Sequence, residues 1–349
     1  MALCPARSQH MLQAAKDAVA KPLSCRAPRV AYQHREVTDV LAQPGVLAVF
    51  GFGADAGAPD DPRWFKVALQ NLDTPAPIEV WTVEAPVTHG REQALRWSAG
   101  DGWLFAAIEL DEATHGGPRD TARQAYQKLL DFVAQRPERH VLRMWNYLGA
   151  INHGDDDAER YKQFCDGRAA GMGEHFRDGF PAATAIGHHA CAQAPQAGAL
   201  QASPLQVYLL ACEHPGERVE NPRQVSAWHY PRQYGRTPPS FARAMNLPGR
   251  DALAISGTAA VVGHASAHAQ DLHAQLDETF ANLDALLERA GMTGFGSEAL
   301  LKAYVRDPAD AASVRDFIQQ RLPGTPLLVL HGDICRRELL VEIDGWRYA

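Results

Sequence analysis

Residues 326–346, PLLVLHGDICRRELLVEIDGW, place a carboxylate inside an apolar strand. Side chains alternate along a β-strand, so Val341 and Ile343 share one face while Glu342 and Asp344 share the other. A carboxylate that is desolvated in this way has a raised pKa, as a general acid near neutral pH requires. The same alternation is also typical of an edge strand on which Glu342 faces water, and the pattern alone leaves both interpretations open.

Composition limits the kind of protein that this 349-residue chain encodes. Its length allows two domains, or one large one, with a sizeable core. The formal net charge is -7 and no basic stripe offsets it, which argues against nucleic acid as a partner but permits a small anionic substrate held by a few arginines. There is no run of about 18 apolar residues, so we expect no membrane partner.

The cysteines and the N-terminus predict a cytoplasmic protein. Residues 1–25 lack the apolar core of a signal peptide. The cysteines are scattered with no Cys-x-x-Cys pair, which favours reduced thiols: Cys4, Cys25, Cys165, Cys191, Cys212 and Cys335. Cys335, just ahead of the terminal strand, is either a small buried hydrophobe or a reactive thiol.

Two regions of the chain repeat one order of elements, a strand followed by an amphipathic helix and a second strand. The expected elements, in chain order, are residues 102–111, 120–136, 140–151, 252–263, 271–290 and 300–308. The repeated order of elements, rather than residue identity, indicates an α+β protein with two related halves.

We expect four segments along the chain. These are an N-terminal arm at 1–35, a first half at 36–186, connecting loops and strands at 187–249, and a second half at 250–349 that carries the terminal strand. The connection contains a Pro- and Arg-rich stretch, residues 220–240, and long ordered loops of this kind are often functional.

Two other patterns imitate cofactor sites but lack the necessary context. GFGADAG (51–57) resembles a dinucleotide fingerprint, yet prolines follow it where a helix would have to begin. Several histidines could be metal ligands or ordinary loop residues, and the pair with helical spacing precedes the expected helix: His188, His189, His264, His268 and His273. We therefore expect neither a nucleotide nor a metal.

The segment ERYKQFCDGRAAG (159–171) predicts a helix with a mixed stripe. Tyr161 and Arg168 share one face with the apolar Phe164 and Cys165. An arginine in this position is either a surface residue whose stem covers apolar neighbours or an anion clamp, and the spacing does not decide between them.

Five motifs in register resemble the chorismatases, the family that removes pyruvate from chorismate in secondary-metabolite and pigment pathways. The motifs are RMWNYLGAIN (143–152), ERYKQFCDGRAAG (159–171), ENPRQVSAWHYPRQYG (220–235), SGTAAVVGHASAH (256–268) and HGDICRRELLVEIDG (331–345). The resemblance runs from about Trp81 to the C-terminus. It implies a YjgF/RidA-like (chorismate-mutase-like) fold used twice in one chain, and catalysis without metal or organic cofactor.

The resemblance also implies roles for individual residues. The family's catalytic glutamate falls on Glu342, which would protonate the enol methylene of chorismate and make its ether a leaving group. Arg168 with Tyr161, and Arg306 as a second candidate, would bind the substrate carboxylates.

Two positions point to the product. Members that form 3-hydroxybenzoate carry a cysteine at the position of Cys335 and a glycine at that of Gly257. The chain is therefore similar to that subtype. Some members of the family also form 4-hydroxybenzoate. The alternatives are a hydrolytic chorismatase that yields a trans-3,4-dihydroxycyclohexadiene carboxylate and a non-catalytic metabolite-binding protein. A monomer or weak homo-oligomer is expected.

Overall fold

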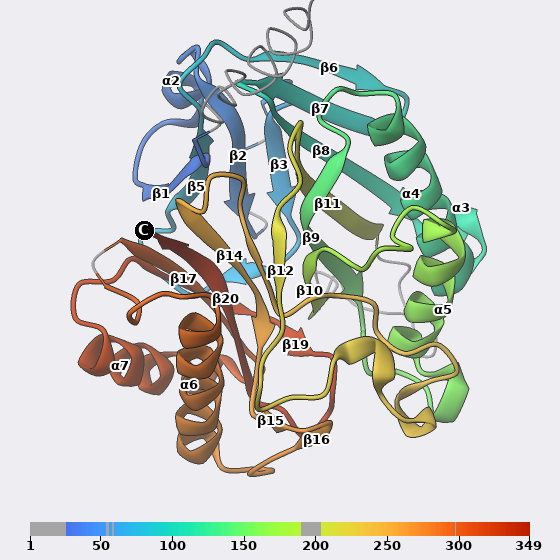
Figure 1. Cartoon of the computed structure of the whole chain (residues 1–349), viewed down its shortest axis with the longest axis vertical. Coiled ribbons are helices and arrows are strands. Elements are labelled where there is room, and N and C mark those ends of the chain that lie inside the picture. The colour runs from blue at the N-terminus through green and yellow to red at the C-terminus, as the bar shows by residue number, and fades with distance from the viewer. Residues whose placement is uncertain (1–25, 54–55, 58, 190–203, 297) are drawn as a thin grey trace, which may run out of the picture.

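The computed structural model describes residues 26–349 except 54–55, 58, 190–203 and 297. It has the expected mixed α+β fold, in which three sheets enclose one core (Figure 1). Most of the expected N-terminal arm lies outside the described residues, but Arg29–Gln33 forms a strand, β1. No helix of the described part of the chain is long and apolar enough to cross a membrane.

The first large sheet has seven strands in the order β19-β10-β9-β11-β8-β7-β6. Its strands are β6 (Thr88–Glu92), β7 (Leu95–Gly100), β8 (Trp103–Asp111), β9 (His140–Gly149), β10 (Ala182–His188), β11 (Pro204–Cys212) and β19 (Asp333–Ile334). The helices that follow β8 and β9 flank it on the outside of the molecule (Figure 1), and they are α3 (Glu112–His115), α4 (Gly117–Ala134) and α5 (Arg160–Met172).

The second large sheet also has seven strands, in the order β12-β13-β14-β20-β17-β18-β4. They are β4 (Gln70–Asn71), β12 (Glu217–Val219), β13 (Ala244–Asn246), β14 (Ala252–Thr258), β17 (Ala299–Val305), β18 (Leu327–His331) and β20 (Val341–Tyr348). The flanking helices are α6 (Leu272–Arg289) and α7 (Ala311–Arg321). Asp271 caps α6, whose Leu276, Phe280 and Leu283 pack on the sheet at helical spacing.

The two large sheets have one topology. The order β10-β9-β11-β8-β7-β6 repeats as β18-β17-β20-β14-β13-β12, and the pairs β9–β10 and β17–β18 are the parallel ones in both. The predicted pair of related halves is therefore confirmed. The stretch at 187–249, expected to hold connecting loops and strands, contains β11 of the first large sheet and β12 and β13 of the second.

A smaller sheet precedes these two and was not expected. It consists of β1, β2 (Val46–Phe52), β3 (Trp64–Val67) and β5 (Ile78–Thr82), with α2 (Val37–Leu41) between β1 and β2. Its order, β3-β2-β5-β1, matches β10-β9-β11-β8, and β2 and β3 are again parallel. It is a shortened third copy of the same unit.

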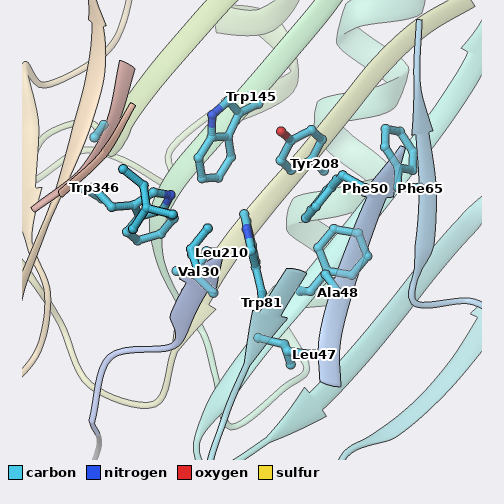
Figure 2. Close-up of a cluster of buried hydrophobic side chains, with 14 of the residues drawn as sticks. Val30, Leu47, Ala48, Phe50, Phe65, Trp81, Trp145, Tyr208, Leu210 and Trp346 are labelled. Carbon is cyan, nitrogen blue, oxygen red and sulfur yellow. The ribbon is translucent and has the colours of Figure 1, made fainter. Parts of the chain in front are cut away.

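Aromatic side chains from all three sheets meet in the shared core (Figure 2). The ring centroids of Trp81 (β5), Trp145 (β9) and Trp346 (β20) lie 5.3–6.0 Å apart, and Tyr208 (β11) stacks on Trp145. Burial of each such ring stabilises the fold by roughly 2–3 kcal/mol, so the three sheets hold one another in place.

Two short strands link the sheets further. β4 comes from the N-terminal unit but pairs with β18, and β19 comes from the C-terminal unit but pairs with β10. The second of these exchanges brings the segment after β19, residues 335–340, against the first sheet. Small elements complete the chain: β15 (Val261–Val262), β16 (Ala265–Ser266) and the 3-10 turns Asp156–Ala158, Ala227–His229, Arg232–Tyr234 and Pro308–Asp310.

Candidate active site

A cavity of about 370 Å³ lies where the two large sheets meet. Its walls come from β10 of the first sheet, from β14 and β20 of the second, from α5, and from the loops around residues 224–243 and 335–339. It brings together five of the six residues proposed from the sequence, namely Tyr161, Arg168, Gly257, Cys335 and Glu342.

Glu342 lies on a central strand and is buried. β20 pairs with β14 on one side and with β17 on the other, so the interpretation of Glu342 as a water-facing residue on an edge strand is wrong. Burial is the main cause that raises the pKa of the carboxyl, the neighbouring Asp344 carboxylate adds to it, and Arg143, Arg243 and Arg336 oppose it, with a net pKa of about 8. A neutral carboxylic acid therefore faces the cavity at neutral pH.

Asp344, on the same face of β20, belongs to a buried polar network. Its Oδ2 accepts hydrogen bonds from Arg143 Nη2 at 3.0 Å, Trp145 Nε1 at 3.0 Å, Thr184 Oγ1 at 2.8 Å and the Tyr304 hydroxyl at 3.0 Å. Asp344 lies beside Glu342 on this face, and its carboxylate is the second cause, after burial, of the raised pKa of Glu342.

Gly257 makes room for the Glu342 carboxyl. A Cβ at Gly257 would lie 2.8 Å from Glu342 Cδ and 3.3 Å from Thr184 Cγ2. The first distance is shorter than real side chains tolerate, so any larger residue would push the acid out of its place. The requirement for glycine here comes from the acid itself.

Arg168 points into the cavity from α5 and is 3% exposed, which excludes the interpretation as a surface arginine. Its Nε and Nη2 are buried and have no hydrogen-bond partner among the described residues. The helix reaches this position by packing closely on α4, because a Cβ at Gly167 or at Gly171 would come within 2.8 Å of α4 atoms. A buried guanidinium with two N–H groups that no described residue accepts can donate hydrogen bonds to an anion in the cavity.

Two further arginines line the cavity and were missed by the sequence analysis. Arg243 donates to the Tyr230 hydroxyl at 2.7 Å, and Arg336 lies over the rings of Tyr230 and Tyr234 at 5.1 and 4.0 Å from their centroids. Within the described part of the chain, neither these two nor Arg168 has a carboxylate within 4.0 Å. Arg243 lies just beyond the Pro- and Arg-rich stretch at 220–240, and Arg336 lies in the HGDICRR motif with no spacing that distinguishes it from Arg337.

Cys335 and Tyr161 form a neutral wall of the cavity. Burial raises the pKa of the Cys335 thiol to about 12, and the nearby Glu342 carboxyl adds to the rise. Burial likewise raises the pKa of Tyr161, whose hydroxyl interacts with the thiols of both Cys335 and Cys165. Cys335 is therefore a thiol rather than a thiolate at neutral pH.

Arg306 is a correction to the expected ligand set. Its guanidinium is outside the cavity and donates to the carbonyls of Leu339 at 2.8 Å and of Ile334 and Arg336 at 2.9 Å. It also contacts the Asp333 carboxylate in an ion pair. These bonds use the donors that an anion would need, so Arg306 holds the loop that carries Cys335 instead of binding a ligand.

The histidines do not converge. His268 pairs with Glu278 at 3.2 Å, His188 interacts with the carbonyl of Pro204 at 3.1 Å, and His189 stacks on His331. In the described ranges, no group of three or more His, Cys, Asp or Glu side chains is arranged to hold a metal ion.

The geometry suits one kind of chemistry. A neutral acid, a neutral thiol and three guanidinium groups surround a cavity between two sheets, and none of these guanidinium groups has a carboxylate partner among the described residues. The cavity can bind a ligand with more than one negative charge and donate a proton to it.

The chain is similar to several known proteins. Residues 79–211 match a family described as "Chorismatase FkbO/Hyg5-like, N-terminal". The chain is 34% identical to a 3-hydroxybenzoate synthase of Streptomyces hygroscopicus over 76% of its own length and 80% of the relative's. It is 31% identical to a chorismatase of the same organism over 93% and 95%. A chorismatase crystal structure superposes with a TM-score of 0.79 at 30% identity, covering 92% of this chain and 98% of the other.

The raised pKa of Glu342 can be measured directly. We expect the side-chain carboxyl carbon of Glu342, followed by ¹³C NMR, to titrate near pH 8. The variant Asp344→Asn removes the neighbouring negative charge and leaves Arg143 uncompensated, so the pKa of Glu342 falls. The exposed Glu288 provides an internal control in the same spectra. A Glu342 signal that titrates near pH 4.5 in the parent protein would contradict the account of the site.

Proposed function

The chain belongs to the chorismatase family of chorismate-processing enzymes, and we propose that it converts chorismate to pyruvate and 3-hydroxybenzoate, alone or with the 4-isomer. The observation that carries this proposal is a neutral glutamic acid in a cavity with three guanidinium groups that lack carboxylate partners. The proposed reaction uses no cofactor.

The charge of the cavity fits the substrate. Chorismate carries two carboxylates, one on the ring and one on the enolpyruvyl group, and Arg168, Arg243 and Arg336 supply three cations. The cavity volume of about 370 Å³ is in the range of small-molecule sites. Burial of Arg168 and Arg243 strengthens each ion pair, because little water competes for the donors.

The first step is a proton transfer. Glu342 donates its proton to the enol methylene of chorismate, which becomes the methyl group of pyruvate, and the adjacent carbon becomes oxocarbenium-like. A carboxyl with a pKa of about 8 is protonated at neutral pH and is matched to this task. Its ionised form, left after the transfer, is stabilised by Arg143, Arg243 and Arg336, of which the last two also line the cavity.

The second step decides the product. The ring hydroxyl at carbon 4 attacks carbon 3, the bond from carbon 3 to the ether oxygen breaks, and pyruvate departs while the hydroxyl proton returns to Glu342. The resulting arene-oxide-like ring opens and loses a ring proton, giving the phenol. Chorismate thus divides into hydroxybenzoate and pyruvate without addition of water.

Cys335 is proposed to assist the opening of this intermediate. Because its pKa is raised to about 12, it acts as a neutral thiol that donates to the ring oxygen and does not attack carbon as a thiolate. Its place beside Tyr161 and Glu342 in the cavity wall supports this role. A non-catalytic binding protein would not require an acid, a thiol and an anion clamp in one cavity.

Replacement of the acid tests the first step. We expect Glu342→Gln to lower the rate of pyruvate release at least about a thousandfold, since the amide cannot donate the proton. The parent enzyme should be active below pH 8 and lose activity as pH rises through the pKa of Glu342, because the protonated form is the active one. Pyruvate is measured by chromatography, thermal unfolding checks the fold, and Glu288→Gln on the exposed face of α6 is the matched control. Near-parental turnover in Glu342→Gln would exclude the mechanism.

Replacement of the thiol tests the second step. We expect Cys335→Ala to keep releasing pyruvate but to divert ring product from hydroxybenzoate toward the non-aromatic dihydroxycyclohexadiene carboxylate, since the ring opening loses its donor. The ratio of the two ring products is measured by mass spectrometry. Cys212→Ala removes a buried thiol outside the cavity and serves as the control. An unchanged product ratio in Cys335→Ala would make Cys335 a space-filling residue.

A further inference from the structure

A bulge interrupts the pairing of β14 with β20 beside the acid. Ile255 pairs with Gly345 and Thr258 with Ile343, so β14 advances one residue more than β20 over this stretch. Bulges of this kind release a backbone group from the ladder and direct it elsewhere. The released group here is the N–H of Gly257, which donates to Thr184 Oγ1 at 2.9 Å.

Thr184 lies on β10 of the first sheet, so this bond crosses between the two large units. The hydroxyl donates to Asp344 Oδ2 at 2.8 Å and also accepts from Arg143 Nη2 at 2.5 Å. A hydroxyl has one proton and two lone pairs, and all of them are used. Its orientation is therefore fixed by three partners, of which Gly257 is the one that borders the cavity.

The position of Gly257 in turn limits the position of Glu342. A Cβ on Gly257 would come within 2.8 Å of Glu342 Cδ, so the Gly257 backbone is a wall against which the carboxyl packs. No hydrogen bond holds the Glu342 carboxyl to any other residue that the structure describes. Packing against this wall, rather than hydrogen bonding, sets where the acid points.

We propose that Thr184 is a positioning residue for the acid: it holds the Gly257 bulge across the unit interface and so keeps the Glu342 carboxyl aimed into the cavity. The inference rests on the proposed role of Glu342. In this role Thr184 acts on the position of the acid through Gly257, while its hydrogen bond to Asp344 reaches the carboxylate beside Glu342.

The rest of the bulge has independent anchors, so loss of the Thr184 hydroxyl should leave the fold intact. Ser256 Oγ donates to the carbonyl of Ala242 at 2.6 Å and accepts from Ala183 N at 2.9 Å, and Ser256 N donates to the carbonyl of Arg243 at 3.0 Å. These bonds join the same strands without Thr184. Removal of the hydroxyl therefore frees Gly257 locally.

The test compares two replacements of nearly the same size. Thr184→Val keeps the shape but leaves Gly257 N–H without its acceptor, and we expect kcat for pyruvate release to fall about tenfold while KM stays within about twofold, as for loss of one orienting contact. Thr184→Ser restores the hydroxyl and should recover kcat to within about threefold of the parent. Hydrogen exchange of the Gly257 amide should accelerate in Thr184→Val and return toward the parent rate in Thr184→Ser.

A matched control removes a hydroxyl elsewhere. Thr279 is buried on α6 and lies outside the cavity, so Thr279→Val should leave kcat unchanged. Parental kcat in Thr184→Val, or a loss that Thr184→Ser does not recover, would overturn the inference. Glu342→Gln is assayed alongside these variants. If it is inactive, a negative result for Thr184 overturns only the role of Thr184. If it is active, the proposed function itself is overturned.

Discussion

The buried ion pair between Arg143 and Asp344 is the constraint on which the site depends. It joins β9 of the first large sheet to β20 of the second, and both side chains are excluded from solvent. Loss of one partner would leave an isolated buried charge at a cost of about 3–5 kcal/mol. The pair also places a fixed negative charge behind Glu342, since two neighbouring carboxyls at one buried position do not both ionise readily. The Asp344 member of this contact thus adds to the effect of burial in raising the pKa of Glu342, whereas Arg143 opposes it.

The internal repetition of the fold explains why chemistry is confined to one junction. Glu342, Glu79 and Gln206 occupy corresponding places in the three units, as their partners on the adjacent strands indicate: Tyr304, Phe50 and Tyr147. Glu79 is paired with the buried Lys302 at 3.0 Å, and Gln206 is bonded to the backbone of residues 66 and 68. Of the three, Glu342 lines the cavity, and no cation of the described residues lies within salt-bridge distance of it. The corresponding position therefore holds an ion-paired carboxylate in one unit, a hydrogen-bonded amide in another and a carboxyl without an ion pair in the third.

Much of this could be predicted from the sequence, where the signal was local. Strand alternation placed Glu342 and Asp344 on one face, and helical spacing grouped Tyr161 with Arg168. Residues whose role depends on distant partners were missed: Arg243 and Arg336 carry no local pattern, and Thr184 matters only because a bulge on another strand reaches it. Arg306 was misassigned because a sequence does not reveal that backbone carbonyls occupy its donors. The third unit escaped notice because its only described helix, α2, has five residues and too little periodicity.

The most direct test of the central claim is to incubate the purified enzyme with chorismate in H₂¹⁸O and to analyse both products by mass spectrometry. The account predicts one pyruvate for each ring product. The ring product should be 3-hydroxybenzoate, with or without the 4-isomer. Its phenolic oxygen should carry no ¹⁸O, because that oxygen comes from the substrate's own hydroxyl. A non-aromatic diol as the main ring product would contradict the internal displacement, and the absence of pyruvate would contradict the reaction altogether.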